Sequence, residues 1–388
     1  MAGGGLMQLV AYGAQDLYLT HEPQITFFKV VYRRHTNFAV ESIEQTISGS
    51  PTLGEEVEVQ ISRNGDLVNN ILLEITVSTD TSSGSSQVTT GAGFALINYV
   101  TIQIGGQDID KQYGGWMQAW HELTASANMR SVVDDMVNLT DDQSTNTRTK
   151  LYVPLMFWFC RDNGLALPLI ALQYHPVNLK IGLSSANDNG CGLGTNLHSA
   201  KCFVDYVFLD TDERKKFAQT KHEYLIEQVQ RFTQTLNTTA SETTKADLIF
   251  NHPVKELVWF IPPKFNSNNS SNIAYNAWLD SGVATLRLNN TLRFKERAGK
   301  YFDRVQVYQH HTGVGRNGLY VYSFALNPEK HQPSGSCNFS RIDSAILEMT
   351  NSSSGITTTN SQSSVHVYAH NYNVLRIMSG MGGLAYSN

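Results

Sequence analysis

The residues of this sequence most able to do chemistry are histidines that fall in or beside predicted strands. A metal centre inside a β-barrel needs several histidines and a carboxylate that converge on one point. His366 and His370 have the spacing of one strand face. His310 and His311 stand next to a predicted loop, and no His-x-His pair with a downstream glutamate occurs in a strand. We therefore expect no metal site, and interpret these histidines as polar positions on an exposed strand face.

Motifs of nucleophilic and nucleotide chemistry are missing from the sequence. It contains no Gly-x-Ser-x-Gly elbow and no Gly-Lys-Ser/Thr phosphate loop, and we interpret Gly380 to Gly383 as flexible backbone after the last strand. The cysteines show no Cys-x-x-Cys spacing, which favours inert thiols over a disulfide framework; they are Cys160, Cys191, Cys202 and Cys337. The sequence thus predicts a protein that is not an enzyme and holds no cofactor.

Carbohydrate binding is the alternative function that the tryptophans leave open, because lectins share β-sandwich folds with proteins of other functions. Indole rings can stack on sugars, and the candidates are Trp116, Trp120, Trp158, Trp259 and Trp278. Trp158 and Trp259 lie in apolar strand runs, so we expect both in the core.

The charge balance argues against a protein that coats nucleic acid. The 388 residues have a formal net charge of −5, and only 16% of them are charged. A phosphate-binding surface needs many basic residues, and the one compact basic cluster is Arg33 to His35. Ser, Thr, Asn and Gln take the place of charged residues, which suits a surface packed against neighbouring molecules. We expect no direct contact with nucleic acid.

No targeting signal stands out in the sequence. No apolar run approaches the roughly 18 residues of a transmembrane helix, and residues 1 to 10 lack the basic and apolar regions of a signal peptide. We expect a protein that is made and assembled in the cytosol.

Most of the chain alternates apolar and polar residues with the period of a β-strand. Val57, Val59 and Ile61 form one such run, and Ile71, Leu73, Ile75 and Val77 form another. Asn64-Gly65 between the two runs predicts a hairpin. Further first-half strands are predicted at 100–104, 151–159, 167–183 and 202–209.

A densely charged segment divides this first strand set from a second one. Residues 211 to 223 follow Asp210, and Asp210-x-x-Glu213 is a capping-box-like start for a short helix. Strands of the second set are predicted at 224–230, 257–261, 284–294, 305–308, 319–326, 342–349 and 365–377. Many short strands with little helix indicate β-sandwiches. We predict an all-β protein with an arm (1–24), a first sandwich (25–210), a helical connector (211–223) and a second sandwich (224–388).

The two halves share a layout. Trp116 to His121 follow Gly114-Gly115, and Tyr301 to His310 follow Gly299, which is 185 residues beyond Gly114. A different spacing, 168 residues, separates the strand starts Leu151 and Leu319. Unequal spacings are expected where an old duplication keeps its strands and varies its loops.

Segments from end to end of the chain resemble the major capsid proteins of nucleocytoplasmic large DNA viruses. The opening residues are similar to that family's arm and first strand region, and further matches lie around the connector, before a late strand and at the C-terminus. The matching segments are 6–20, 23–37, 211–219, 222–228, 333–343 and 371–388.

The resemblance implies a double jelly roll, two tandem eight-stranded β-sandwiches, whose role is structural. It implies that the chain forms a homotrimer, a pseudo-hexagonal capsomer. Many capsomers would then tile an icosahedral shell over an internal viral membrane, with minor capsid proteins as further partners. The expected location is the capsid of the virion, after assembly in the host cytoplasm.

The arm is the segment we expect to make assembly contacts. Its short apolar patches follow three glycines, and such a terminus is more easily ordered by a partner than by its own core. The patches consist of Leu6, Met7, Leu9, Val10, Leu17 and Leu19. We predict that the arm crosses the underside of the capsomer and contacts minor capsid proteins or a neighbour; a frayed or locally packed terminus is the alternative.

Overall fold

The chain forms two units, Met1–Asn37 and Phe38–Asn388. The computed structural model describes residues 3–79, 91–138, 148–185, 195–236, 242–262, 275, 277–351 and 364–387. The first unit holds two short helices, α1 (Gly4–Val10) and α2 (Leu17–Thr20), and neither contains a buried residue.

Strands of the second unit that precede residue 210 form two antiparallel sheets, each ordered by pairing between distant segments. One has the order β1-β10-β4-β7 with β8 beside β4, and the other has the order β2-β3-β9-β5-β6. Their bounds are β1 (Phe38–Gln45), β2 (Ile47–Ser48), β3 (Glu56–Gln60), β4 (Leu67–Thr79), β5 (Ile97–Ile104), β6 (Gln107–Tyr113), β7 (Thr149–Pro154), β8 (Leu167–Pro168), β9 (Val177–Leu183) and β10 (Thr195–Leu209).

Strands after residue 220 repeat the arrangement. One sheet has the order β11-β19-β13-β16, with β17 beside β13 and β20 beside β19, and the other has the order β12-β18-β14-β15. Their bounds are β11 (His222–Thr235), β12 (Thr243–Asp247), β13 (Pro253–Phe260), β14 (Val283–Leu288), β15 (Thr291–Ala298), β16 (Tyr320–Ser323), β17 (Cys337–Asn338), β18 (Ala345–Thr350), β19 (Ser364–Met378) and β20 (Met381–Leu384).

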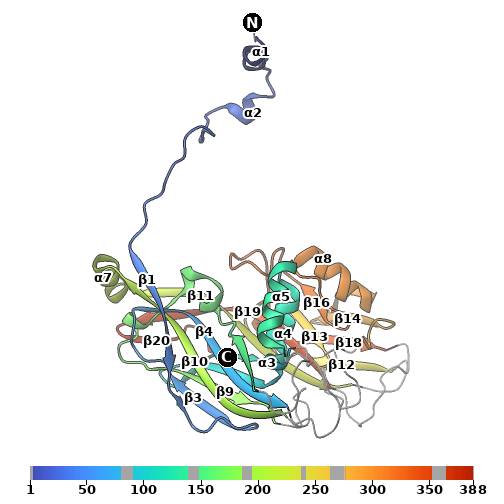
Figure 1. The fold of residues 1–388 in the computed structure, drawn as a ribbon. Helices are drawn as coiled ribbons and strands as arrows, with labels where there is room; N and C mark the ends of the chain where they lie inside the picture. Colours follow the sequence, from blue (N-terminus) through green and yellow to red (C-terminus); the bar gives the residue numbers. More distant parts are fainter. Residues whose placement is uncertain are drawn as a thin grey trace. The chain divides into compact units, whose positions relative to one another are not determined.

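Each half is a jelly roll. Its first strand pairs with a long late strand, β1 with β10 and β11 with β19. Its two sheets enclose an apolar core built from the alternating positions: Val57 and Val59 are buried on β3 while Glu56 is exposed. The second core gathers Leu257, Trp259 and other residues of the later strands. The predicted all-β double jelly roll is therefore confirmed. Figure 1 shows β1, β3 and β4 grouped apart from β13, β16 and β18, with α4 between them.

Helices occupy the connections between strands. They are α3 (Ala92–Ala95), α4 (Gly114–Thr124), α5 (Ala127–Val137), α6 (Trp158–Arg161), α7 (Thr211–Gln219) and α8 (Gln306–His310), with short turns at η1 (Asn163–Leu165), η2 (Leu169–Ala171) and η4 (Phe339–Arg341) and a π-helix η3 (Tyr301–Val305). The helix predicted after Asp210 is present as α7, and the Asp210 carboxylate accepts a hydrogen bond from the Thr211 backbone N–H at its start.

Several local predictions were wrong. Gly380 to Gly383 were predicted to be flexible backbone after the last strand, but Met381–Leu384 form β20, which pairs with β19. The strand predicted at 151–159 ends in α6, and the one predicted at 167–183 is interrupted by η2.

Asn64-Gly65 does not close a hairpin, because β3 pairs with β9 in one sheet and β4 pairs with β10 in the other. Neither residue adopts the positive φ that the hairpin prediction assumed. Gly65 is instead needed for close approach, because a Cβ there would lie 2.8 Å from the Cβ of Tyr206. The strand predicted at 305–308 is helical, since it falls on the end of η3 and the start of α8.

Candidate assembly site

The predicted arm residues lie in the first unit, and all six are exposed there. They are Leu6, Met7, Leu9, Val10, Leu17 and Leu19. Exposure continues through a second apolar segment that includes Ile25, Phe27, Phe28, Val30, Val31 and Tyr32. Soluble proteins rarely leave so many large apolar side chains open unless a partner covers them.

Helix α4 holds the two jelly rolls together within the second unit. Its side chains Trp116, Ala119, Trp120 and Leu123 pack in one apolar cluster with residues from all four strands of the β11-β19-β13-β16 path, namely Val229, Val258, Phe260, Val321 and Tyr368. The residues between these on the same strands, such as Leu257 and Trp259, point into the second core. The sheet therefore has its inner face on its own core and its outer face under α4.

A network of buried charges lies on this covered face, and Glu227 of β11 is its centre. The Lys255 ammonium is 2.6 Å from one oxygen of Glu227, and Arg161 Nη1 of the first jelly roll is 2.8 Å from the other. Lys255 has no exposed side-chain surface. Burial lowers the pKa of Lys255, and the Glu227 carboxylate opposes this shift. Burial would raise the pKa of Glu227, but the neighbouring His370, His331 and Lys255 side chains hold it well below its usual range.

The network continues through two histidines. His370 lies between Glu227 and Glu256, at 3.1 Å and 3.2 Å from their oxygens. His311 lies between Glu256 and Glu329, at 3.0 Å and 3.2 Å. Although burial disfavours the charged imidazole, these two carboxylates raise the pKa of His311 to about 9. Glu256 is also buried, yet His311 and His370 keep its pKa far below the usual range. At neutral pH, the His311 imidazole is therefore protonated and the Glu256 carboxyl group is ionised.

The sequence interpretation of His370 as an exposed strand residue was wrong, because the side chain is fully buried under α4. Trp120 of α4 meets the His370 ring edge-on, with centroids 4.8 Å apart, and Arg161 lies over the Trp120 ring at 4.5 Å. His366 lies four residues before His370 on the same strand, β19, and is partly exposed. Strand periodicity assigns a face but cannot show that a distant helix covers it.

This arrangement is built for cohesion rather than for catalysis. In the described ranges, no group of three or more His, Cys, Asp or Glu side chains is placed to hold a metal ion. Both nitrogens of His311 already face carboxylates, so neither is open to a ligand. Sequence reasoning missed Lys255 and Glu256, although two charges inside the apolar run from Val254 to Phe260 are a signal of a buried ion pair.

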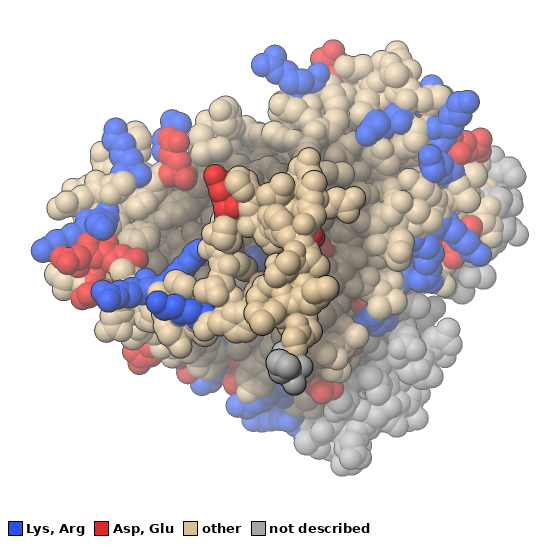
Figure 2. Space-filling view, turned by 90° about the horizontal axis from the view of Figure 1, so that it is seen from above, with Lys and Arg blue, Asp and Glu red and all other residues tan. Residues whose placement is uncertain are grey.

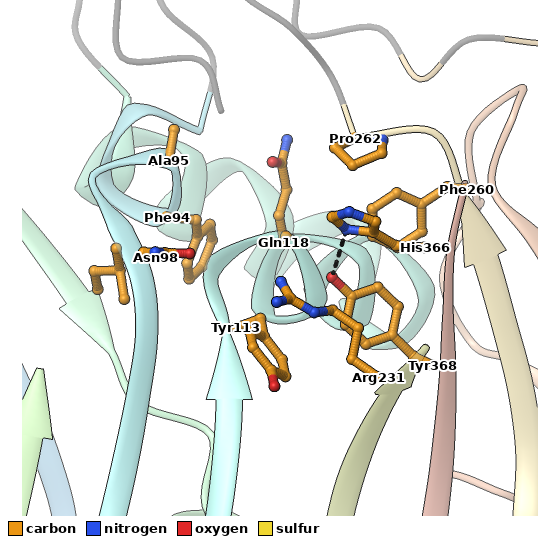
Figure 3. Close-up of a pocket in the computed structure, with 12 residues that line it drawn as sticks. Phe94, Ala95, Asn98, Tyr113, Gln118, Arg231, Phe260, Pro262, His366 and Tyr368 are labelled. Atoms are coloured by element: carbon orange, nitrogen blue, oxygen red, sulfur yellow. Dashed lines mark hydrogen bonds between the residues drawn. The ribbon is translucent and has the colours of Figure 1, made fainter. Parts of the chain in front are cut away.

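A small pocket at the same junction is lined by both jelly rolls. Figure 3 shows Tyr113 and Gln118 from one side facing Arg231, His366 and Tyr368 from the other. The Arg231 guanidinium lies over the Tyr113 ring at 3.8 Å, and burial together with Arg231 lowers the pKa of His366 to about 4. The cavity offers about 30 Å³ to water-sized molecules. This space fits a water molecule and not a substrate.

The structure also places the tryptophans considered for sugar binding and three of the four cysteines. All five tryptophans are buried, including Trp158 and Trp259 as predicted, so none presents a ring to a sugar. Cys160, Cys202 and Cys337 are free thiols, and burial raises the pKa of Cys160 and of Cys202 to about 12. Cys191 lies outside the described residues. Among the helices that the structure describes, none is long and apolar enough to cross a membrane.

Charged groups are sparse on the face of the molecule seen in Figure 2. In Figure 2, Lys, Arg, Asp and Glu side chains form small separate groups with broad uncharged areas between them. Uncharged surface is less costly to desolvate in a contact than densely charged surface.

Comparison with known proteins agrees with this geometry. Residues 26–210 match the family model "Major capsid protein N-terminus", and residues 213–383 match "Large eukaryotic DNA virus major capsid protein". The major capsid protein of Pyramimonas orientalis virus is 49% identical, with all of both chains covered. That of Paramecium bursaria Chlorella virus 1 is 44% identical over 99% of this chain and 100% of the relative.

Solved structures give the same result. The capsid of virus PBCV-1 contains a chain that matches with a TM-score of 0.82 and 40% identity, over 94% of this chain and 100% of that chain. The Faustovirus major capsid protein, at 11% identity and a TM-score of 0.66, shares the fold.

Two jelly rolls in one chain, with a buried structural junction and extensive uncharged surface, define a capsid protein of the double jelly-roll class. Proteins of this class are structural and not enzymes. The chain belongs to the family of large eukaryotic DNA virus major capsid proteins. It is a component of the virus capsid, and building a shell requires that copies of it associate.

Proposed function

We propose that three copies of this chain form a pseudo-hexagonal capsomer, and that many capsomers tile an icosahedral shell. The observation that carries this proposal is the repeated sheet order within one chain. Three chains with two similar jelly rolls each present six similar wedges, and a closed three-fold ring uses the same pair of surfaces at every contact.

Sedimentation equilibrium of the purified full chain tests the proposal. The chain mass is 43.2 kDa, so a trimer has a mass of about 130 kDa. A single species of that mass supports the capsomer. A monomer at high protein concentration contradicts it.

We propose the domain division 1–24 for the arm, 25–210 and 224–388 for the jelly rolls, and 211–223 for the connector. Matches of separate family models to 26–210 and 213–383 support it. Capsomers would be assembled in the host cytoplasm, with an internal viral membrane beneath the shell and no direct contact with nucleic acid.

The arm is proposed to contact minor capsid proteins or a neighbouring capsomer through Leu6, Met7, Leu9, Val10, Leu17 and Leu19. Their exposure within the first unit supports this role. Deleting residues 1–24 should leave soluble trimers that build no shells. Normal particle yield from the deletion variant would contradict the role of the arm.

A further inference from the structure

The two jelly rolls carry equivalent helical segments at the same point of their topology. α4 follows β6, and η3 with α8 follows β15; β6 and β15 are the end strands of the sheets β2-β3-β9-β5-β6 and β12-β18-β14-β15. Gly114 and Gly299 begin them, and a Cβ on either would lie about 2 Å from a backbone carbonyl oxygen, of Ile97 or of Leu279. Met117 points into the first core, and Phe302, 185 residues later, points into the second. The same spacing makes Trp120 equivalent to Val305, and Leu123 equivalent to Tyr308.

These equivalent positions differ sharply in burial. Trp120 and Leu123 are 6% and 0% exposed, because α4 lies on the outer face of the β11-β19-β13-β16 sheet. Val305 is 39% exposed and Tyr308 is 88% exposed. The inner side of α8 is nevertheless packed, since Val307 is buried. The second helical segment therefore presents an apolar ridge at the position where the first makes the internal junction.

The first jelly roll has a matching surface that α4 does not reach. The sheet β1-β10-β4-β7 has the same strand order as the sheet under α4. Val40 pairs with Val207, and Glu44 pairs with Phe203, so these four side chains share its outer face. Val40 is exposed, and Phe203 and Val207 are half-buried. On the covered sheet, the outward residues Val229 and Tyr368 of the equivalent strands β11 and β19 are buried.

We infer that the η3–α8 ridge of one copy docks on the outer face of the β1-β10-β4-β7 sheet of a second copy. The contact repeats between chains the junction that α4 makes within one chain. It rests on the proposed capsomer and specifies which two surfaces meet in it. Because the two surfaces differ, the contact runs head to tail, and three such contacts close a ring.

Charge favours this pairing over its alternatives. Residues 38–210 contain 8 Lys and Arg against 19 Asp and Glu, a formal charge of −11, whereas residues 211–388 contain 18 against 13, a charge of +5. Lys300 and Arg304 flank the ridge and are exposed. Asp205 lies on the receiving face, where Glu44 is already paired with Lys201 at 3.0 Å. Contact of a first jelly roll with another first jelly roll would bring like charges together, which disfavours it.

Sedimentation velocity of the full chain and the variant Tyr308→Asp tests the ridge. Burying a carboxylate at the centre of an apolar contact should weaken trimer association on the order of 30-fold. The matched control is Ile249→Asp, which makes the same change in charge at an exposed apolar residue of the connection between β12 and β13. Far-ultraviolet circular dichroism and a cooperative melt matching the control exclude misfolding as the cause. A Tyr308→Asp protein that stays trimeric like the control overturns the inference.

A photo-crosslinking residue at position 308 identifies the receiving surface without destabilising it. We expect inter-chain crosslinks to peptides that contain residues 38–45 or 202–209. Crosslinks confined to other segments of a trimeric protein overturn the inference while leaving the capsomer intact. A wild-type protein that is monomeric in the same runs overturns the capsomer and the inference together.

Discussion

The two jelly rolls have the same strand order, yet their equivalent sheets have opposite surroundings. The β11-β19-β13-β16 sheet is covered on both faces and holds a network of buried charges. The β1-β10-β4-β7 sheet is covered on its inner face, and its outer face still exposes Val40. Topology alone therefore does not decide which surface of a jelly roll is buried. The outer face of the second sheet is covered by α4 of the same chain. We infer that the outer face of the first sheet is covered by the η3–α8 ridge of a second copy.

The largest effect is expected from breaking the charge network on the covered sheet. Glu227→Gln leaves Arg161 and the fully buried Lys255 without their carboxylate. We expect the free energy of unfolding to fall by about 3–5 kcal/mol, as for other broken buried ion pairs. Denaturant titration at one fixed protein concentration measures it. Recovery of much of the loss in Glu227→Gln/Lys255→Met would show that the stranded ammonium is the cause, and an unchanged midpoint in the single variant would refute the network.

Truncating equivalent helix positions sharpens the comparison directly. Leu123→Ala removes a buried side chain and should cost about 2–5 kcal/mol of unfolding free energy. Tyr308→Ala removes an exposed side chain, so the free energy of unfolding should change by about 0.5 kcal/mol or less. Thermal melts of both variants under conditions that keep the chain monomeric give the contrast. Equal losses would mean that the two helices are not in the different surroundings described.

A pH dependence of stability is expected from His311 on the covered side. The pKa of His311 is about 9 in the folded protein, above the value near 6.5 of an unfolded histidine. Its contribution is therefore complete below pH 6.5 and is lost as the pH rises towards 9, on the order of 3 kcal/mol. Stability curves of the wild type and His311→Gln between pH 6 and 10 should converge at the alkaline end. A constant gap across that range would contradict the role given to His311.

The smallest effect is expected from a surface ion pair. Arg376 and Glu223 are 2.9 Å apart, and both side chains are about half exposed. Arg376→Ala should change the unfolding free energy by less than about 1 kcal/mol, because solvent screens such pairs. Denaturant titration beside Glu227→Gln provides the comparison. A loss as large as that of the buried variant would show that burial is not what distinguishes the two pairs.

Much of the fold could be predicted from the sequence, because strand alternation reports directly on burial inside one sandwich. Val57 and Val59 are buried as their pattern requires, and the charged segment after Asp210 is helical. Errors arose where a local sequence pattern was used to predict a structure that depends on contacts with distant parts of the chain. The turn at Asn64-Gly65 leads into another sheet, and the apolar positions at 305 and 308 belong to a helix.

The candidate site was predicted less completely. The apolar arm could be predicted from its composition, since its short apolar patches follow three glycines. The junction could not be found this way, because Glu227, His370 and Arg161 are separated by long stretches of chain and meet only after both jelly rolls have folded. A pairing of this kind is visible in three dimensions alone.

Single-particle electron cryomicroscopy of the full-length protein tests the central claim most directly. We predict a three-fold particle in which Tyr308 of each copy lies against the Val40 face of the next. A particle without three-fold symmetry, or a three-fold particle in which both of these side chains remain exposed to solvent, would contradict the account.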